Sequence, residues 1–587
     1  MTRCAAVFLV SLAAQAADNS LLRGGYHFVQ LRIAGAGAEA VNAGGTLTFD
    51  GAGRYQIRAR AGKGKNPAAE LARAGTYDAA GEPGAILIDN PVEPGPRLRL
   101  RYTAGAAVLA GSAGVGGAHE VLVAVRAPAA PVTAALLNGI YAGGFMALHG
   151  AAPEGLATAF VELHANGAGG FGKSLAIAHA ASIDDVNREE TRSGSTYRLE
   201  PNGWGSAKFE GPSDALHGDR EILVSGDGEM LLGYGVSSHT RDILVAVRKP
   251  AEAASFQFQG PFWMFELFAE NEFAFRPKTA RFGSAEGIIV GRGEGTALLS
   301  QHVRTDGRGV HLTTSNRYQL SATGSLDPAG KAGVNNFALN VAAGVFAGAH
   351  AGAKGELSLG HGVFLGLRIP PVESASGVML SPHGVAHRAA PELPVTAIAP
   401  GVALSLHGHG FAAPDPKSIV VTINGAPVEA APVSPGRIDV KAPESLEPGV
   451  AAFQVTVSGR ASNVVTVAVV PASPMVLTAS PSGTGVVAAA HPDGSPVSLE
   501  KPAVAGQPVS IRVSGLGPKA GEVGILFDGR PEKVTAAAPA PDAPGVHLIT
   551  VRAPASAGGA PAKIAIVAPD SVSDLADLPV TGSKGAQ

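Results

Sequence analysis

The sequence predicts an all-β fold: three homologous antiparallel modules, barrel-like or sandwich-like, followed by two further β-sandwiches. Apolar and polar residues alternate in many short segments, as Leu98, Leu100 and Tyr102 do in RLRLRYT, which is the period of a half-buried strand. The chain has 78 glycines and 43 prolines in 587 residues yet is 45% hydrophobic, which favours short strands joined by tight turns over disorder. Sequence patterns also return roughly every 120 residues, the mark of internal repeats.

The first sixteen residues, MTRCAAVFLVSLAAQA, predict a signal peptide at 1–16. Arg3 provides a basic start, the apolar run that follows is too short to cross a bilayer, and Ala14-Gln15-Ala16 is a small-residue cleavage site. Cleavage there removes Cys4, the chain's one cysteine, so the mature chain would have neither disulfides nor thiol chemistry. We therefore expect a secreted or cell-surface protein with no transmembrane segment in the mature chain.

The overall charge argues against one class of partner. With 45 basic and 48 acidic residues, the formal net charge is −3 at pH 7. Proteins that bind nucleic acid usually carry a strongly basic surface, because the phosphate backbone dominates that affinity. No nucleic-acid partner is expected.

Three copies of one module make up the N-terminal part of the chain. The motif LVAVR or its relative FLGLR recurs, each time with a proline two residues after the arginine, at 122–126, 244–248 and 364–368. Tyr77, Tyr197 and Tyr318 precede these arginines by nearly the same distance. About eight strands fit in each copy, and closing them into a meander barrel hides the sheet edges, with a sandwich as the alternative. The expected modules are residues 20–129, 134–251 and 255–371.

The segment NGAGGFGKS invites a different interpretation, because Gly167, Gly172, Lys173 and Ser174 have the spacing of a phosphate-binding P-loop. Module 1 has the related turn DGAGRY at 50–55 without Lys-Ser, and Asn-Gly or Asp-Gly is the chemistry of hairpin turns. A P-loop also requires a helix that starts at the lysine, whereas the repeat predicts a strand there. We interpret the segment as a β-turn and expect neither a nucleotide site nor a cofactor.

The pattern changes near Met379. Short β-branched runs now alternate with turn signals such as Asn424-Gly425 and Ser458-Gly459, which is typical of an immunoglobulin-like sandwich. A second copy follows, in which VSIRVSGLGP parallels VALSLHGHGF and VRAP parallels VKAP. Two immunoglobulin-like domains are expected, at 379–472 and 473–582.

These last residues resemble a paired C-terminal domain, related to IPT/TIG immunoglobulin-like modules, of secreted acidobacterial proteins. The residues that carry the resemblance are Leu380-Ser381-Pro382, Pro400-Gly401, Gly408–Phe411, Asn424–Pro427, Ser434–Ile438, His491–Ser495, Ser514–Pro518 and Gly545–His547. The resemblance implies an immunoglobulin-like fold and secretion, and it brings no activity with it. His407 and His409 depart from the polar residues expected at their positions. The N-terminal modules resemble β-rich repeats found beside such tails.

Residues 256–282 are unusually aromatic, with eight of the 21 phenylalanines and one of the two tryptophans. Phenylalanines two positions apart line one face of a sheet, which favours a core role. The alternative is an exposed platform of Phe262, Trp263 and Phe265, able to stack on sugar rings or to anchor a partner. Trp204, in the turn NGWGS, is the next candidate for an exposed ligand-binding ring.

Two polar clusters do not predict a metal site. His407 and His409 share one face of a strand, but two ligands are too few. Asp184-Asp185 and Glu189-Glu190 lack the spacing and the glycine of a calcium loop, and we interpret them as a solvated loop. The sequence also contains no Gly-x-Ser-x-Gly elbow and no HExxH motif, so no catalytic residue is assigned.

Taken together, these patterns favour an exported, non-catalytic binding or scaffold protein whose partner is a polysaccharide or a surface protein. Linked modules gain avidity without any single strong site. The alternative is an extracellular polymer hydrolase with its site in one N-terminal module and the tail as a spacer, because paired carboxylates converge in space rather than in sequence. A third hypothesis is a small apolar ligand inside each barrel.

Overall fold

The fold is almost entirely β, and the helical segments among the described residues are short 3-10 turns: η1 (Asn19–Leu21), η3 (Ala104–Ala106), η4 (Ala134–Leu136), η6 (Pro416–Ser418) and η7 (Gly517–Glu522). The computed structural model describes residues 19–581 apart from 35–38, 80–83, 116, 150–154, 179–187, 212–215, 239, 251–257, 270–281, 294–295, 306–307, 321–324, 329–333, 341–343, 352–360, 372–375, 480–484, 544, 555–560 and 574. The expected signal peptide at 1–16 lies outside the described residues. Among the described residues, no helix has both the length and the apolar character needed to span a membrane.

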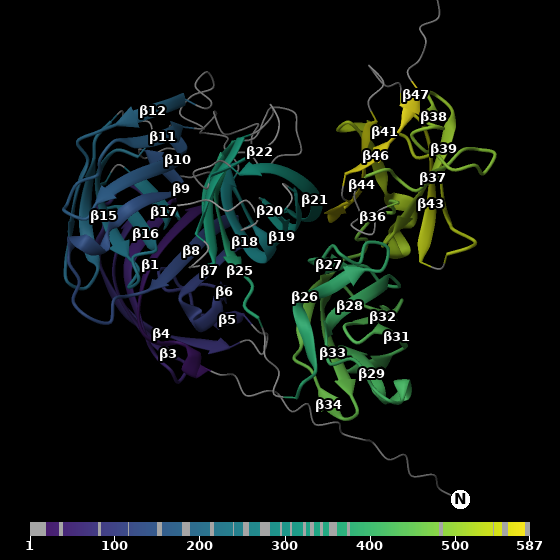
Figure 1. Ribbon diagram of the computed structural model, residues 1–587, viewed down its shortest axis with the longest axis horizontal. Coiled ribbons are helices and arrows are strands. Elements are labelled where there is room, and N and C mark those ends of the chain that lie inside the picture. The colour runs from purple at the N-terminus through teal and green to yellow at the C-terminus, as the bar shows by residue number, and fades with distance from the viewer. Residues whose placement is uncertain are drawn as a thin grey trace, which may run out of the picture.

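Module 1 is a closed meander barrel, as the sequence predicts (Figure 1). Each strand pairs antiparallel with the next, and the last strand returns to the first. Its strands are β1 (Arg23–Ala34), β2 (Val41–Asp50), β3 (Arg54–Lys63), β4 (Ala69–Ala79), β5 (Ala85–Ile88), β6 (Leu98–Tyr102), β7 (Val108–Val115) and β8 (Ala118–Arg126). We call this ring barrel 1.

Module 2 repeats the ring, which we call barrel 2, with one interruption. Its strands are β9 (Asn138–His149), β10 (Gly155–Asn166), β11 (Ser174–Ala178), β12 (Arg188–Arg192), β13 (Thr196–Leu199), β14 (Trp204–Phe209), β15 (Gly218–Val224), β16 (Met230–Gly235) and β17 (Thr240–Arg248). The sheet order places β12 at one edge and β13 at the other. An isolated bridge between Gly170 and Thr196 connects the two sides. β12 and β13 thus take the place of β4, broken at residues 193–195.

Module 3 is a third eight-strand ring. Its strands are β18 (Gln259–Ala269), β19 (Phe282–Arg292), β20 (Thr296–Thr305), β21 (Arg308–Leu320), β22 (Ser325–Pro328), β23 (Val334–Asn340), β24 (Val345–Ala351) and β25 (His361–Arg368). Neighbouring strands pair in sequence order, β20 with β21 included, and β25 pairs back to β18.

The P-loop-like segment is a turn followed by a strand. The Asn166 side-chain oxygen accepts hydrogen bonds from the backbone amides of Ala168 and Gly170. Asp50 binds the amides of Ala52 and Arg54 in the same way in module 1. After the turn, β11 begins at Ser174, where a P-loop would have a helix.

The three barrels are fused through one hydrophobic core. In β8, Leu122 and Ala124 belong to the interior of barrel 1, whereas Val121, Val123 and Val125 join a core shared by all three modules. β17 and β25 divide their side chains in the same way, with these residues in the shared core: Ile243, Val245, Val247, Val363, Leu365 and Leu367. The repeated motif is therefore apolar on both faces because it builds two cores at once.

Two immunoglobulin-like β-sandwiches form the tail, drawn in green and yellow in Figure 1. The first has β26 (Met379–His387), β27 (Ala397–Ile398), β28 (Ala403–His409), β29 (Ile419–Ile423), β30 (Ala426–Val428), β31 (Ala430–Ser434), β32 (Arg437–Lys441), β33 (Gly449–Val457), β34 (Arg460–Ala461) and β35 (Val465–Val469). Its two sheets enclose a core that Leu298 of module 3 and Met475 of the second sandwich also join.

The second sandwich also has its own core. Its strands are β36 (Met475–Val476), β37 (Ala489–Ala490), β38 (Ala503–Val504), β39 (Pro508–Ser514), β40 (Gly524–Phe527), β41 (Arg530–Glu532), β42 (Ala536–Pro539), β43 (Val546–Arg552), β44 (Ala562–Ala568), β45 (Ser571–Val572), β46 (Ala576–Leu578) and β47 (Val580–Thr581). The short β45 pairs parallel with β21 of module 3, which joins the tail to the barrels.

Candidate functional site

Each of the first two barrels has an aromatic end, where its first strand begins, and a polar end, where that strand finishes. At the aromatic end of barrel 1, the Tyr77 hydroxyl donates to the backbone carbonyls of Asn19 and Leu22. Tyr197 makes the equivalent bonds in barrel 2, to the carbonyls of Ala134 and Leu137. The repeated tyrosine therefore holds in place the chain that enters each barrel.

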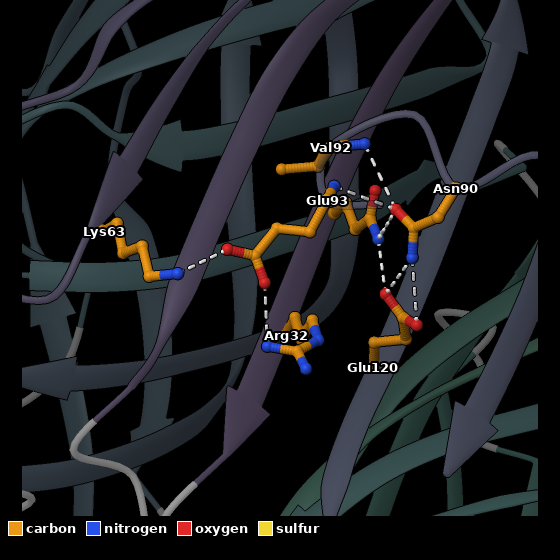
Figure 2. Close-up of polar contacts among 7 residues, drawn as sticks. Arg32, Lys63, Asn90, Val92, Glu93 and Glu120 are labelled. Atoms are coloured by element: carbon orange, nitrogen blue, oxygen red, sulfur yellow. Dashed lines mark hydrogen bonds and ion pairs between the residues drawn. The ribbon is translucent and has the colours of Figure 1, made fainter. Parts of the chain in front are cut away.

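The polar end of barrel 1 holds a buried carboxylate, Glu120, shown in Figure 2. The Asn90 side-chain amide donates to Glu120 Oε2 at 3.0 Å, and the amide of Gln30 also donates to this oxygen. Burial raises the pKa of Glu120 above its ordinary value, and the two amide bonds oppose that rise. The carboxylate is thus held by two neutral donors, Gln30 of β1 and Asn90 of the segment between β5 and β6.

A segment of chain caps this end of barrel 1. Val92 inserts into the barrel core, and Glu93 lies between Arg32 at 2.9 Å and Lys63 at 2.7 Å (Figure 2). From β4, the Arg73 guanidinium donates to the carbonyls of Asn90 and Pro91 at 2.6 and 2.7 Å. The Asn90 and Pro91 carbonyls and the Glu93 carboxylate are thereby satisfied by the chain itself, whereas Gln30 Oε1 is buried without a hydrogen-bond partner among the described residues.

Barrel 2 uses a related device with different chemistry. Leu216 is buried in the barrel core, and the Arg192 guanidinium, on β12, donates to its carbonyl. Deeper inside, Arg220 Nε lies 2.7 Å from Asp242 Oδ2, and both side chains are almost fully buried. An arginine again holds the capping chain, but the carboxylate within this barrel is paired with a cation.

An open cleft of about 390 Å³ lies at the break between β12 and β13. Its lining residues are Glu190, Thr191, Arg192, Ser193, Glu210 and Gly211. Arg192 Nη2 donates to Glu190 Oε2 at 2.7 Å, and Lys208 Nζ lies 3.0 Å from Glu210 Oε1 at the rim. Carboxylate, guanidinium, hydroxyl and backbone groups converge here, which makes this cleft the candidate functional site.

The aromatic residues predicted from the sequence lie elsewhere. Phe262, Trp263 and Phe265 are 0, 4 and 2% exposed, so they form no surface platform and pack as the core interpretation expects. Phe262 faces the interior of the third ring, whereas Trp263 and Phe265 join the shared core. The Arg101 guanidinium of module 1 lies 3.9 Å from the centre of the Trp263 ring. Ligand binding by these rings stays a prediction, but exposed stacking is excluded by their burial.

Trp204 is also partly buried, at the contact between modules 1 and 2. Its indole Nε1 donates to Glu221 Oε2 at 2.7 Å, and the Tyr234 hydroxyl donates to the same oxygen at 2.9 Å. The other oxygen of Glu221 pairs with Arg60 of module 1. Burial and the Glu221 charge raise the pKa of Tyr234, so the phenol stays protonated and donating. The tryptophan thus takes part in an intermodule contact.

The acidic pair Glu189-Glu190 is not part of a solvated loop as expected, because β12 spans it and the Glu190 side chain is 12% exposed. Its expected companions Asp184-Asp185 lie outside the described residues. His407 lies within β28, where burial lowers its pKa. Among the described residues, no group of three or more metal-ligating side chains gathers.

Sequence reasoning missed Arg192, Ser193 and Glu210 as site residues. Arg192 is the last residue of β12, and Glu210 directly follows β14. The two residues line the same cleft because the barrel wall is broken between β12 and β13. One signal existed: the repeat aligns Tyr77 with Tyr197, which places Ser193 opposite Arg73. Module 2 has a serine, Ser193, where module 1 has Arg73, and the two modules differ in structure at this position.

No protein-family model matches the chain, and no curated protein matches it. Among solved structures, it is similar to the Bacteroides ovatus mixed-linkage glucan utilization locus protein SGBP-B in complex with a mixed-linkage heptasaccharide (12% identity, TM-score 0.20, 42% of this chain and 56% of that one). It is also similar to the I9–I11 tandem of titin (10%, 0.13, 49% and 94%) and to the gamma-CGTase of alkalophilic Bacillus clarkii (14%, 0.14, 50% and 39%). TM-scores this low carry no argument about function.

Proposed function

We propose that the chain is an exported, non-catalytic binding or scaffold protein whose partner outside the cell is a polysaccharide. The observation that carries this proposal is the open cleft of barrel 2, lined by hydrogen-bonding groups and set on three barrels that share one core. A rigid body of this kind presents a site at low entropic cost, because little chain must be ordered on binding. The signal-peptide pattern supports export, and the tail supports an IPT/TIG-related spacer.

A polymer hydrolase is the second candidate, because Glu190 and Glu210 line the same cleft and glycosidases act through two carboxyl groups. Binding is the better supported function, since each carboxylate already contacts a cation, Arg192 or Lys208. Such pairs suit a carboxylate that accepts hydrogen bonds from hydroxyls better than a carboxyl group that donates a proton.

The test is to incubate the full chain with insoluble polysaccharides (cellulose, β-1,3-glucan, mannan and starch) and to measure depletion from the supernatant together with the release of new reducing ends. Depletion by at least one polymer without reducing ends is the expected result. Reducing ends that increase with time would establish the hydrolase instead. If no polymer depletes the protein from the supernatant and none is cleaved, the polysaccharide proposal is wrong.

A further inference from the structure

We infer that the cleft between β12 and β13 is a saccharide subsite that holds adjacent hydroxyl groups of a neutral sugar residue. This inference rests on the proposed function and deepens it by assigning the ligand class to named residues: Glu190, Thr191, Arg192, Ser193, Glu210 and Gly211. None of them belongs to a hydrophobic core.

The buried Arg192 has a hydrogen-bond donor that a ligand in the cleft could satisfy. Only 8% of this residue is exposed, two of its guanidinium nitrogens bind Leu216 and Glu190, and its Nε lacks a hydrogen-bond partner among the described residues. A buried donor left unsatisfied costs about 1–3 kcal/mol, so such a group is expected to meet a ligand or water. Arg192 borders the cleft, which gives that donor a place to be satisfied.

Gly211 lies against this buried donor. Its φ is +135°, and a Cβ built on it would lie 2.7 Å from Arg192 Nε. Any larger residue would therefore press on the guanidinium as well as adopt an unfavourable backbone conformation. The glycine leaves the Nε side of the arginine bordered by backbone rather than by a side chain.

The lining selects the ligand class. Every described lining residue is charged, carries a hydroxyl group or is glycine, so no aliphatic or aromatic residue lines the described cleft for a lipid or an aromatic ligand to pack against. Glu190 is paired with Arg192 and Glu210 with Lys208, so the described lining has no excess of positive charge to attract phosphate or other anions. Carboxylates accept from hydroxyls, and Arg192 Nε donates to a hydroxyl or ring oxygen, which matches the alternating donors and acceptors of a neutral sugar.

The experiment is isothermal titration calorimetry of the full chain with neutral hexasaccharides (β-1,4-glucan, β-1,3-glucan, β-1,4-mannan and α-1,4-glucan). Two cleft variants are compared with wild type: Glu210→Gln, which removes one charged acceptor, and Ser193→Tyr, which fills the cleft from an exposed position. Neither side chain is in a core, so both variants should fold. The matched control is Glu93→Gln, at the capped polar end of barrel 1.

For the hexasaccharide that binds, Glu210→Gln should weaken binding about tenfold, because a hydrogen bond to a neutral amide oxygen replaces a stronger one to a charged carboxylate. Ser193→Tyr should abolish binding, and Glu93→Gln should leave it unchanged. Wild-type binding that neither cleft variant alters would overturn this inference and leave the proposed function standing. A wild-type chain that binds none of the hexasaccharides but is depleted by a polymer also overturns this inference. If the chain binds neither hexasaccharides nor polymers, both this inference and the proposed function are wrong.

Discussion

Barrels 1 and 2 are built on the same repeat, and their polar ends differ in one strand. In barrel 1, β4 runs unbroken over Ala69–Ala79 and carries Arg73, which holds the capping chain. In barrel 2, the corresponding path stops at Arg192 and resumes at Thr196, and the cleft lies at the break. The core positions that close each ring are kept, while the wall and its capping chemistry have changed.

The comparison of the two barrels shows which features of the repeat the fold requires and which can vary. The tyrosines at the aromatic ends and the apolar residues on both faces of β8 and β17 recur, because each barrel needs an interior and a place in the shared core. At the polar ends, Glu120 is held by amides in one barrel and Asp242 by Arg220 in the other. Either chemistry holds the buried carboxylate of its barrel, so this end can diverge.

The largest loss of stability is expected from breaking the buried ion pair inside barrel 2. Asp242→Asn leaves Arg220 as a buried cation facing a neutral amide, and removing one partner of a buried pair typically destabilises by about 3–5 kcal/mol. The measurement is denaturant unfolding followed by tryptophan fluorescence, which reports on the barrels because Trp204 and Trp263 both lie there. The control is Asp219→Asn, an exposed neighbour that should change little. Equal effects of the two variants would contradict a structural role for the pair.

Much of the fold is predictable because it follows from local periodicity and repetition. Alternation within the LVAVR strands, the Asn-Gly and Asp-Gly turns and the spacing of the copies predict β-modules without any long-range information. The burial of Trp263 was harder to predict. The residue lies on the outer face of module 3, and the sequence does not reveal that this face contacts Arg101 of module 1. An aromatic segment suits a shared core and an exposed platform equally well until the packing of the modules is known.

The candidate site was not predictable in the same way. Glu190 precedes Arg192 by two residues, but Glu210 reaches the cleft from the end of another strand. Their meeting depends on a break of three residues in a strand, and such breaks leave no periodic signal. The polar end of barrel 1 was missed for the same reason, since Asn90 and Glu120 come from segments 30 residues apart.

A smaller effect is expected from releasing the cap of barrel 1. Arg73→Met removes the two hydrogen bonds to the Asn90 and Pro91 carbonyls, and the loss should be about 1–3 kcal/mol. Hydrogen exchange at the Val92 amide should accelerate more than the global stability falls, because the cap opens locally. Arg58→Met, at an exposed position on β3, is the control. Unchanged exchange at Val92 would show that the arginine does not hold the cap.

The amide-held carboxylate should be visible as a dependence of stability on pH. Because burial raises the pKa of Glu120, the unfolded chain loses its proton before the folded chain does, and stability falls as pH rises from the ordinary glutamate range toward the raised value. Glu120→Gln should remove this part of the slope, because it replaces the titrating carboxyl group with an uncharged amide of about the same size. Unfolding by urea at pH 4.5, 5.5 and 6.5, followed by tryptophan fluorescence, compares the two. Parallel slopes would mean that Glu120 is not perturbed.

The smallest effect concerns Glu93, which bridges Arg32 and Lys63 at the rim of barrel 1. These side chains keep contact with water, and exposed ion pairs typically contribute only about 0.2–1 kcal/mol, so Glu93→Gln should destabilise by about 0.5 kcal/mol at low salt. The difference should disappear in 1 M NaCl, where charges are screened over about 3 Å. A large loss that persists in salt would instead make Glu93 part of the cap's rigid core. In that case, the two polar ends would differ in strength as well as in chemistry, and the closed end of barrel 1 would owe its closure to this bridge as much as to Arg73.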